Sequence, residues 1–149
     1  MSNVPKISEA ASMALHAMAG LAQEPERALT TGAMASRLGV SEAHLSKVLQ
    51  RLARVGLVRS TRGPKGGFRL ARASDQISLR EVYETIEGPL QARTCLLEVP
   101  ACDQQHCILG DLLPTINHLV ADYLDNTRLS DVAAIRRGDD GEHQEDHPH

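Results

Sequence analysis

Two short helical patterns, separated by a glycine, constrain the fold of this chain more than any other feature. Thr31 can cap a helix that ends before Gly39, and Gly39 can adopt the left-handed conformation that closes a helix. Ser41 can cap the next helix, which runs from Glu42 to about residue 55. Its apolar residues form one stripe: Leu45, Val48, Leu49 and Leu52. This spacing predicts a helix-turn-helix pair.

The second helix of this pair leaves a polar face off the apolar stripe. That face is net basic and consists of Glu42, His44, Ser46, Lys47, Gln50, Arg51 and Arg54, with Ser41 at its start. A helix face of this kind can enter the major groove of double-stranded DNA. A helical hairpin with a solvated face has the same pattern, so this stretch alone leaves both interpretations open.

The segment that follows favours DNA binding. Residues 57–62 and 68–72 have the composition of two strands, and residues 63–67 between them are rich in glycine. Apolar and arginine residues alternate in the second strand, so one face is apolar and the other cationic. A hairpin directly after a helix-turn-helix is a wing.

The tip of this predicted wing holds the residues expected to approach phosphates or a minor groove. They are Arg62, Lys65, Gly66 and Gly67. A glycine-rich turn can also bind nucleotide phosphates. However, neither the G-x-G-x-x-G nor the Walker spacing is present, and no helix opens directly after the turn.

Further helical patterns complete a mainly α-helical fold with one small β-hairpin. They cover residues 7–22, 78–87 and 109–126, with a short element at 129–135. The chain has no Trp, two Tyr and one Phe, so its core must consist of Leu, Ala, Val and Met. The helix at 109–126 has a broad apolar stripe, which predicts a homodimer interface; burial against its own domain is the alternative. We expect no membrane span, no secretion signal and a cytoplasmic location.

Charge divides the chain into two halves. Residues 1–80 carry twelve Lys and Arg against five Asp and Glu, a net charge of +7, whereas residues 81–149 carry four against fourteen, a net charge of −10. A basic front half fits a polyanionic partner, and solvated charged faces are the alternative.

Three cysteines, Cys95, Cys102 and Cys107, fall in one stretch between the hairpin and the apolar helix. Thiolates suit an iron–sulfur cluster or zinc, and an odd number of cysteines argues against a structural disulfide. Because the gaps of six and four residues match neither paired zinc knuckles nor a Cys-x-x-Cys pair, the spacing favours an iron–sulfur cluster. Three other interpretations of the cysteines stay open: thiol redox sensing, zinc binding, or no functional role. The protein could also be an iron–sulfur enzyme or an electron carrier. The chain lacks a nucleophile–base pair, and a carrier has no need of a basic wing.

The chain resembles IscR- and NsrR-type regulators of the Rrf2 superfamily over about residues 4–133. The resemblance rests on the helix-turn-helix, the wing at 58–68, the helix ending at Gly88, the three-cysteine loop and the segment 127–132. It implies a winged-helix homodimer whose long helix crosses to the partner. It also implies that the cysteines hold a 2Fe–2S or 4Fe–4S cluster that senses cluster supply, nitric oxide or redox state.

The fourth ligand of such a cluster departs from the family pattern. Some relatives use a histidine three residues after the last cysteine, where this chain has Gly110. Others use an acidic residue in the first helix of the partner subunit, where this chain has Ser12. The candidates here are Glu9, one turn before Ser12, and the local residues Glu98, Asp103 and His106.

These patterns together predict a transcriptional repressor, not an enzyme, that binds a palindromic promoter site. Residues 1–88 would form the DNA-binding domain and 89–110 the cluster-binding loop. Residues 111–135 would form the dimerisation helix with a docked segment, and 136–149 a disordered tail.

Overall fold

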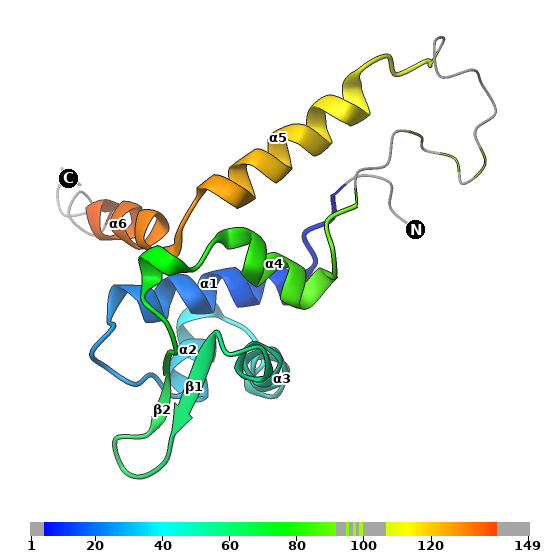
Figure 1. Ribbon diagram of the computed structural model, residues 1–149. Helices are drawn as coiled ribbons and strands as arrows, with labels where there is room; N and C mark the ends of the chain where they lie inside the picture. The colour runs from blue at the N-terminus through cyan, green and yellow to red at the C-terminus, as the bar shows by residue number, and fades with distance from the viewer. Residues whose placement is uncertain (1–4, 92–94, 96, 98, 100–106, 140–149) are drawn as a thin grey trace, which may run out of the picture.

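The computed structural model describes residues 5–91, 95, 97, 99 and 107–139. Residues 136–139 are described by their backbone alone. These residues form six α-helices, one antiparallel hairpin and one short 3-10 helix (Figure 1). The elements in order are α1 (Glu9–Gln23), α2 (Thr31–Leu38), α3 (Glu42–Arg54), β1 (Val58–Thr61), β2 (Gly67–Leu70), η1 (Ser74–Gln76), α4 (Leu79–Glu87), α5 (Leu112–Asn126) and α6 (Leu129–Asp139). The mainly α-helical fold with a hairpin wing is therefore confirmed.

Hydroxyl side chains cap the first four helices, at Ser8, Thr30, Ser41 and Ser78. The cap of α2 is Thr30 and not the predicted Thr31, because the Thr30 hydroxyl accepts the Ala33 N–H at 3.1 Å. Gly39 ends α2 in the left-handed conformation, with φ 65° and ψ 35°, as its position predicted. The turn between α2 and α3 is thus specified by local chemistry.

The hairpin is anchored to the body of the protein at Leu29. In the ladder Val58 faces Leu70, and Ser60 faces Phe68. On its other side Phe68 exchanges two backbone hydrogen bonds with Leu29, at 2.8 and 3.0 Å. Leu29 therefore forms an isolated antiparallel β-bridge that fixes the wing against the segment before α2.

The core forms around α1, which lies between α3, α4 and α6 (Figure 1). Its buried positions are mostly alanines, and these small side chains allow neighbouring helices to approach closely: Ala11, Ala14, Ala17, Ala19 and Ala22. Leucine, isoleucine and methionine fill the remaining space, led by Met18, Leu45, Leu49 and Ile77. The aliphatic core expected from the composition is confirmed.

α5 projects away from the bundle and packs on it through α4 (Figure 1). It begins at Leu112, later than the predicted residue 109, and Pro114 falls in its first turn, where the missing N–H costs least. Asp111 occupies the cap position, but its side chain makes no capping hydrogen bond.

α6 extends the fold beyond the predicted boundary. The docked element was expected to end at residue 135 and the disordered tail to begin at 136, but the helix continues to Asp139. The sequence does not indicate this extension, because Arg136, Arg137 and Gly138 are polar or helix-ending residues. Residues 140–149 lie outside the described part of the chain. Within the described part, no helix combines the length and apolar character needed to span a bilayer.

Candidate nucleic-acid interface and cysteine site

α3 presents its predicted polar face to solvent and its apolar stripe to the core. Glu42, His44 and Lys47 are exposed, whereas Ser46 is half-buried. The Ser41 hydroxyl accepts the His44 N–H at 3.3 Å, so it has a structural role at the start of the helix. Glu42 lies in the first turn, where the helix dipole favours a carboxylate. His44 and Lys47 are thus the clearest groove-facing candidates.

Arg51 belongs to the predicted DNA face and is exposed, but its guanidinium hydrogen-bonds to another helix of the same chain. Its Nη2 donates to the carbonyl oxygens of Thr85 at 3.0 Å and Ile86 at 2.9 Å. Both carbonyls lie in the last turn of α4, which contains no basic residue of its own. Arg51 therefore places a cation at the negative end of a second helix.

The remaining cations of α3 and the hairpin have no carboxylate partner among the described residues. They are Lys47, Arg54, Arg59, Arg62, Lys65 and Arg69. Four arginines elsewhere do form ion pairs with carboxylates: Arg27, Arg37, Arg72 and Arg80. Unpaired like charges gathered on one region repel one another, and a polyanion would remove that repulsion.

Two of these cations were not singled out as site residues by the sequence. Arg59 and Arg69 lie directly opposite each other in the ladder, an arrangement that disfavours folding unless an anion lies between or beside them. The Arg69 Nε is buried without an acceptor among the described residues. Strand register could have found this pair from the sequence, had the hairpin been aligned residue by residue.

The tip of the wing combines exposed charge with constrained glycines. Arg62 and Lys65 are exposed on the turn. A Cβ at Gly66 would lie 2.5 Å from the Thr61 carbonyl oxygen, and one at Gly67 would lie 2.5 Å from that of Leu29. Gly67 also has φ +140°, so both glycines are required by the shape of the hairpin itself.

The structure describes two of the three cysteines. Cys95 and Cys107 are free thiols and are half-buried. Cys102 and the candidate ligands Glu98, Asp103 and His106 lie outside the described residues. Within the described residues, no three His, Cys, Asp or Glu side chains gather as a metal site. The donor set of three soft thiolates still suits an iron–sulfur cluster in chemical terms.

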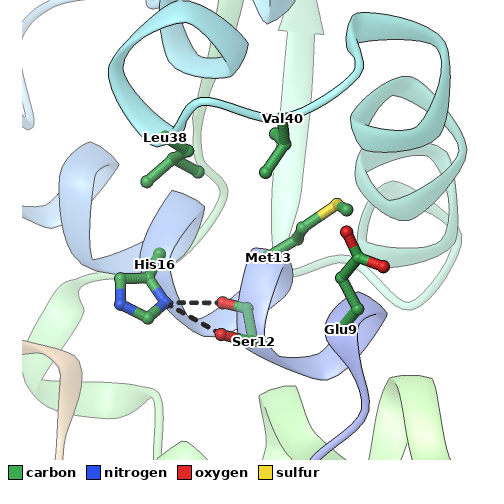
Figure 2. A pocket seen from close by; sticks show the side chains of 6 residues that line it. All are labelled: Glu9, Ser12, Met13, His16, Leu38 and Val40. Carbon is green, nitrogen blue, oxygen red and sulfur yellow. Dashed lines mark hydrogen bonds between the residues drawn. The ribbon is translucent and has the colours of Figure 1, made fainter.

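Glu9 lies in a groove on α1, apart from the described cysteines. The groove has a volume of about 150 Å³ and is lined by Glu9, Ser12, Met13, His16, Leu38 and Val40. Figure 2 shows the α1 side chains facing the turn between α2 and α3. The residues that line this groove include no described cysteine.

His16 in the same groove was missed by the sequence analysis. Its Nδ1 lies 2.7 Å from the backbone carbonyl oxygen of Ser12 (Figure 2). Because a carbonyl oxygen can only accept, Nδ1 carries the proton, and Nε2 of the neutral ring keeps its lone pair. The i, i+4 spacing of Ser12 and His16 was the available signal.

Glu84 on α4 fixes the start of the segment that leads to the cysteines. Its Oε1 accepts the Leu90 N–H at 3.0 Å and pairs with the Arg80 Nε at 2.9 Å. The Leu90 hydrogen bond and, after it, the Arg80 contact hold the pKa of the Glu84 carboxyl below its ordinary value, against partial burial. Arg80 in turn contacts Asp125 of α5 at 2.7 Å. Glu84 and Asp125 raise the pKa of Arg80.

A helix-turn-helix followed by a basic hairpin defines a winged-helix DNA-binding protein. Comparison with known families makes this more specific. The chain belongs to the Rrf2 family, whose model is described as an iron-dependent transcriptional regulator and matches residues 7–135. It is therefore a transcriptional regulator and not an enzyme, and membership in this family implies DNA binding.

Individual relatives agree with this assignment. An HTH-type transcriptional regulator of Neisseria meningitidis serogroup A is 30% identical over 129 residues, 86% of this chain and 87% of that protein. The regulator IscR of Erwinia tasmaniensis is 28% identical over 99 residues, 66% of this chain and 60% of that protein.

Solved structures share the fold along almost the whole chain. CymR, the global cysteine regulator of Bacillus subtilis, is 28% identical with a TM-score of 0.75, covering 88% of this chain and 98% of that one. The oxidised form of Staphylococcus aureus CymR is 26% identical with a TM-score of 0.69, covering 87% and 96%. T. potens IscR, at 24% identity and a TM-score of 0.70 over 95% and 94%, supports the fold alone.

Proposed function

We propose that this protein is a repressor whose affinity for promoter DNA is set by an iron–sulfur cluster on Cys95, Cys102 and Cys107. The observation that carries the DNA-binding half is the group of cations on α3 and the hairpin that lack carboxylate partners among the described residues. The observation that supports the sensing half is the set of three thiols placed between the DNA-binding elements and α5.

On DNA, the first turns of α3 would enter the major groove. The groove-facing residues would be Ser41, Glu42, His44, Ser46 and Lys47, while Arg62, Lys65, Gly66 and Gly67 would lie along a phosphate backbone or minor groove. The exposure of His44, Lys47, Arg62 and Lys65 supports these assignments. Arg51 was predicted to join them, and its bonds to α4 suggest another role, developed below.

At the cysteine site, three thiolates would bind the cluster and a fourth ligand would complete it. A cluster supplies a group that responds to iron supply, nitric oxide or oxidants. Glu9 and His106 are the candidates for the fourth ligand, and its identity would decide between 2Fe–2S and 4Fe–4S. By the resemblance to relatives whose fourth ligand comes from the first helix of the partner, Glu9 would serve the cluster of a partner subunit, and no described cysteine lines its groove.

α5 would form the homodimer interface through a second apolar face. Leu113 and Leu124 are buried, and Leu124 joins the core with residues of α4, whereas Leu119 and Tyr123 are 68% and 58% exposed. Helical spacing places the exposed pair on one stripe with Leu112. A two-fold dimer would present two recognition helices to a palindromic site, and such a protein would act in the cytoplasm, where promoter DNA is.

A metal-free thiol switch is the second candidate. Cys95 and Cys107 are free thiols, and the structural relatives include the cysteine regulator CymR of Bacillus subtilis and the oxidised form of Staphylococcus aureus CymR. In this case oxidation of the cysteines, and not cluster loss, would change DNA affinity. Zinc in place of a cluster is less favoured, because the spacing of the cysteines does not match paired zinc knuckles.

Anaerobic purification separates these candidates. Our proposal predicts a coloured protein containing iron and acid-labile sulfide, and Cys107→Ser should lose both while keeping the fold. A colourless, iron-free protein that responds to oxidants would favour the thiol switch. Stoichiometric zinc without sulfide would favour a zinc site.

A further inference from the structure

The last two turns of α4 connect the recognition helix with the segment that carries the cysteines. From α3, Arg51 donates two hydrogen bonds to the carbonyl oxygens of Thr85 and Ile86. From the other side, the Leu90 N–H donates to Glu84 at 3.0 Å, five residues before Cys95. Both bonds end on neighbouring residues of a single helix.

Two other elements end on the same part of α4. Ser8, the cap of α1, contacts the Glu87 carboxylate through its hydroxyl and its N–H. Arg80 bridges Glu84 to Asp125 of α5. A displacement of the segment after α4 would therefore shift the contacts that α4 makes with α1 and α5. Through Arg51, it would also shift the contact with α3.

The position of Arg51 on α3 argues against a role in reading bases. Recognition helices contact base edges mainly through their N-terminal residues. Arg51 lies nine residues after Glu42, which is about 13 Å further along the helix axis. In addition, the two carbonyl acceptors already occupy its Nη2 group.

We propose that Arg51 is a positioning residue that couples the state of the cysteine segment to the placement of the recognition helix. It holds the C-terminal half of α3 against the end of α4, so that α3 follows α4 when the segment after Gly88 rearranges. This inference rests on the proposed function, because the rearrangement is the one that the cysteine site would undergo.

The test compares two matched variants of the full-length protein. Arg51→Met removes the guanidinium and keeps an apolar stem. Arg54→Met makes the same change on the same helix, at a residue without an ionic partner in the described part of the chain. Both are measured on a duplex that the wild-type protein selects from a randomised pool.

Two quantities decide the outcome: the ratio of DNA affinities between cluster-loaded and cluster-free protein, and the slope of log affinity against log salt. For Arg51→Met we expect the ratio to fall to about one, with an unchanged salt slope, whereas Arg54→Met keeps the wild-type ratio. A retained ratio in Arg51→Met, with a slope shallower by about 0.9 for each lost phosphate contact, would overturn the proposal.

Two further measurements keep the test decisive. If Arg51→Met fails to fold, Glu84→Gln, which weakens the Leu90 connection without touching α3, must lower the same ratio; an unchanged ratio would refute the coupling. If the wild-type protein carries no cluster and its DNA affinity does not depend on the state of the cysteines, the proposed function fails. Arg51 is then judged by amide exchange at Leu90. Exchange must quicken in Arg51→Met and not in Arg54→Met, and equal exchange would refute the coupling.

Discussion

Lys65 offers a quantitative test of the wing as a phosphate contact. Its side chain is exposed on the hairpin turn and has no carboxylate partner among the described residues, so Lys65→Ala breaks no internal contact. In a homodimer the substitution removes two cations. Each neutralised phosphate contributes about 0.9 to the slope of log affinity against log salt, so the slope should become shallower by about 1.8.

The expected effect is large enough to measure by fluorescence anisotropy on a labelled duplex. Between about 50 and 200 mM salt, a slope change of about 1.8 reduces the loss of affinity by about tenfold. Arg27→Ala is the control, because Arg27 is an exposed cation away from α3 and the hairpin, paired with Glu24. An unchanged slope in Lys65→Ala, or an equal change in Arg27→Ala, would refute a phosphate contact at the wing tip.

Three further predictions concern the fold, the dimer and the acid response. Gly67→Ala should destabilise the protein by about 2 kcal/mol in urea unfolding, because its Cβ would lie 2.5 Å from a carbonyl oxygen. By comparison, Gly20→Ala, which has open space around its Cβ, should stabilise α1 by about 0.5–1 kcal/mol. Leu119→Glu should give a monomer in sedimentation, because two copies lose about 1–2 kcal/mol each and bury a charge, whereas His118→Glu, about 100° around the helix from Leu119, should stay dimeric; equal behaviour would exclude the α5 interface. The pKa of the Glu84 carboxyl is lower in the folded protein than its ordinary value of 4.5. Its hydrogen bond to the start of the cysteine segment is therefore fully present above pH 4.5 and is lost as the pH falls through the pKa of the folded protein. Protection of the Leu90 amide, the ratio of its intrinsic to its observed exchange rate, should therefore fall only at acid pH, and a Glu84→Gln protein whose protection has the same pH profile would contradict this.

The helix-turn-helix and the wing could be predicted from the sequence because their determinants are local. Gly39 must adopt a left-handed conformation, Ser41 caps α3, and the alternation around Phe68 fixes the faces of β2. Each of these signals depends on residues a few positions away, and the structure confirms the corresponding elements.

The features that could not be predicted depend on contacts between distant segments. Leu29 forms its β-bridge only because Phe68, far along the chain, is brought beside it. Arg51 looks like one more basic residue of the DNA face until α4 presents its carbonyls. The bounds of α5 and α6 differ from the predicted ones because local sequence defines helix ends less sharply than helix interiors.

The candidate site was predictable in its residue types and only partly in its arrangement. Exposure of Lys47, Arg62 and Lys65 agrees with a DNA-facing surface. The Arg59–Arg69 pair becomes visible only once the two strands are aligned residue by residue. For the cysteines, the spacing indicates the chemistry, and the contacts of Cys102 lie outside the described residues.

The central claim is that the state of the three-cysteine site sets the affinity for DNA. The most direct measurement compares the dissociation constants of anaerobically reconstituted and cluster-free protein for one duplex at one salt concentration, with iron and sulfide determined on the same samples. We predict at least about a tenfold difference, a coupling of about 1.4 kcal/mol, which disappears in Cys107→Ser. Equal constants for a protein shown to carry its cluster would contradict the account.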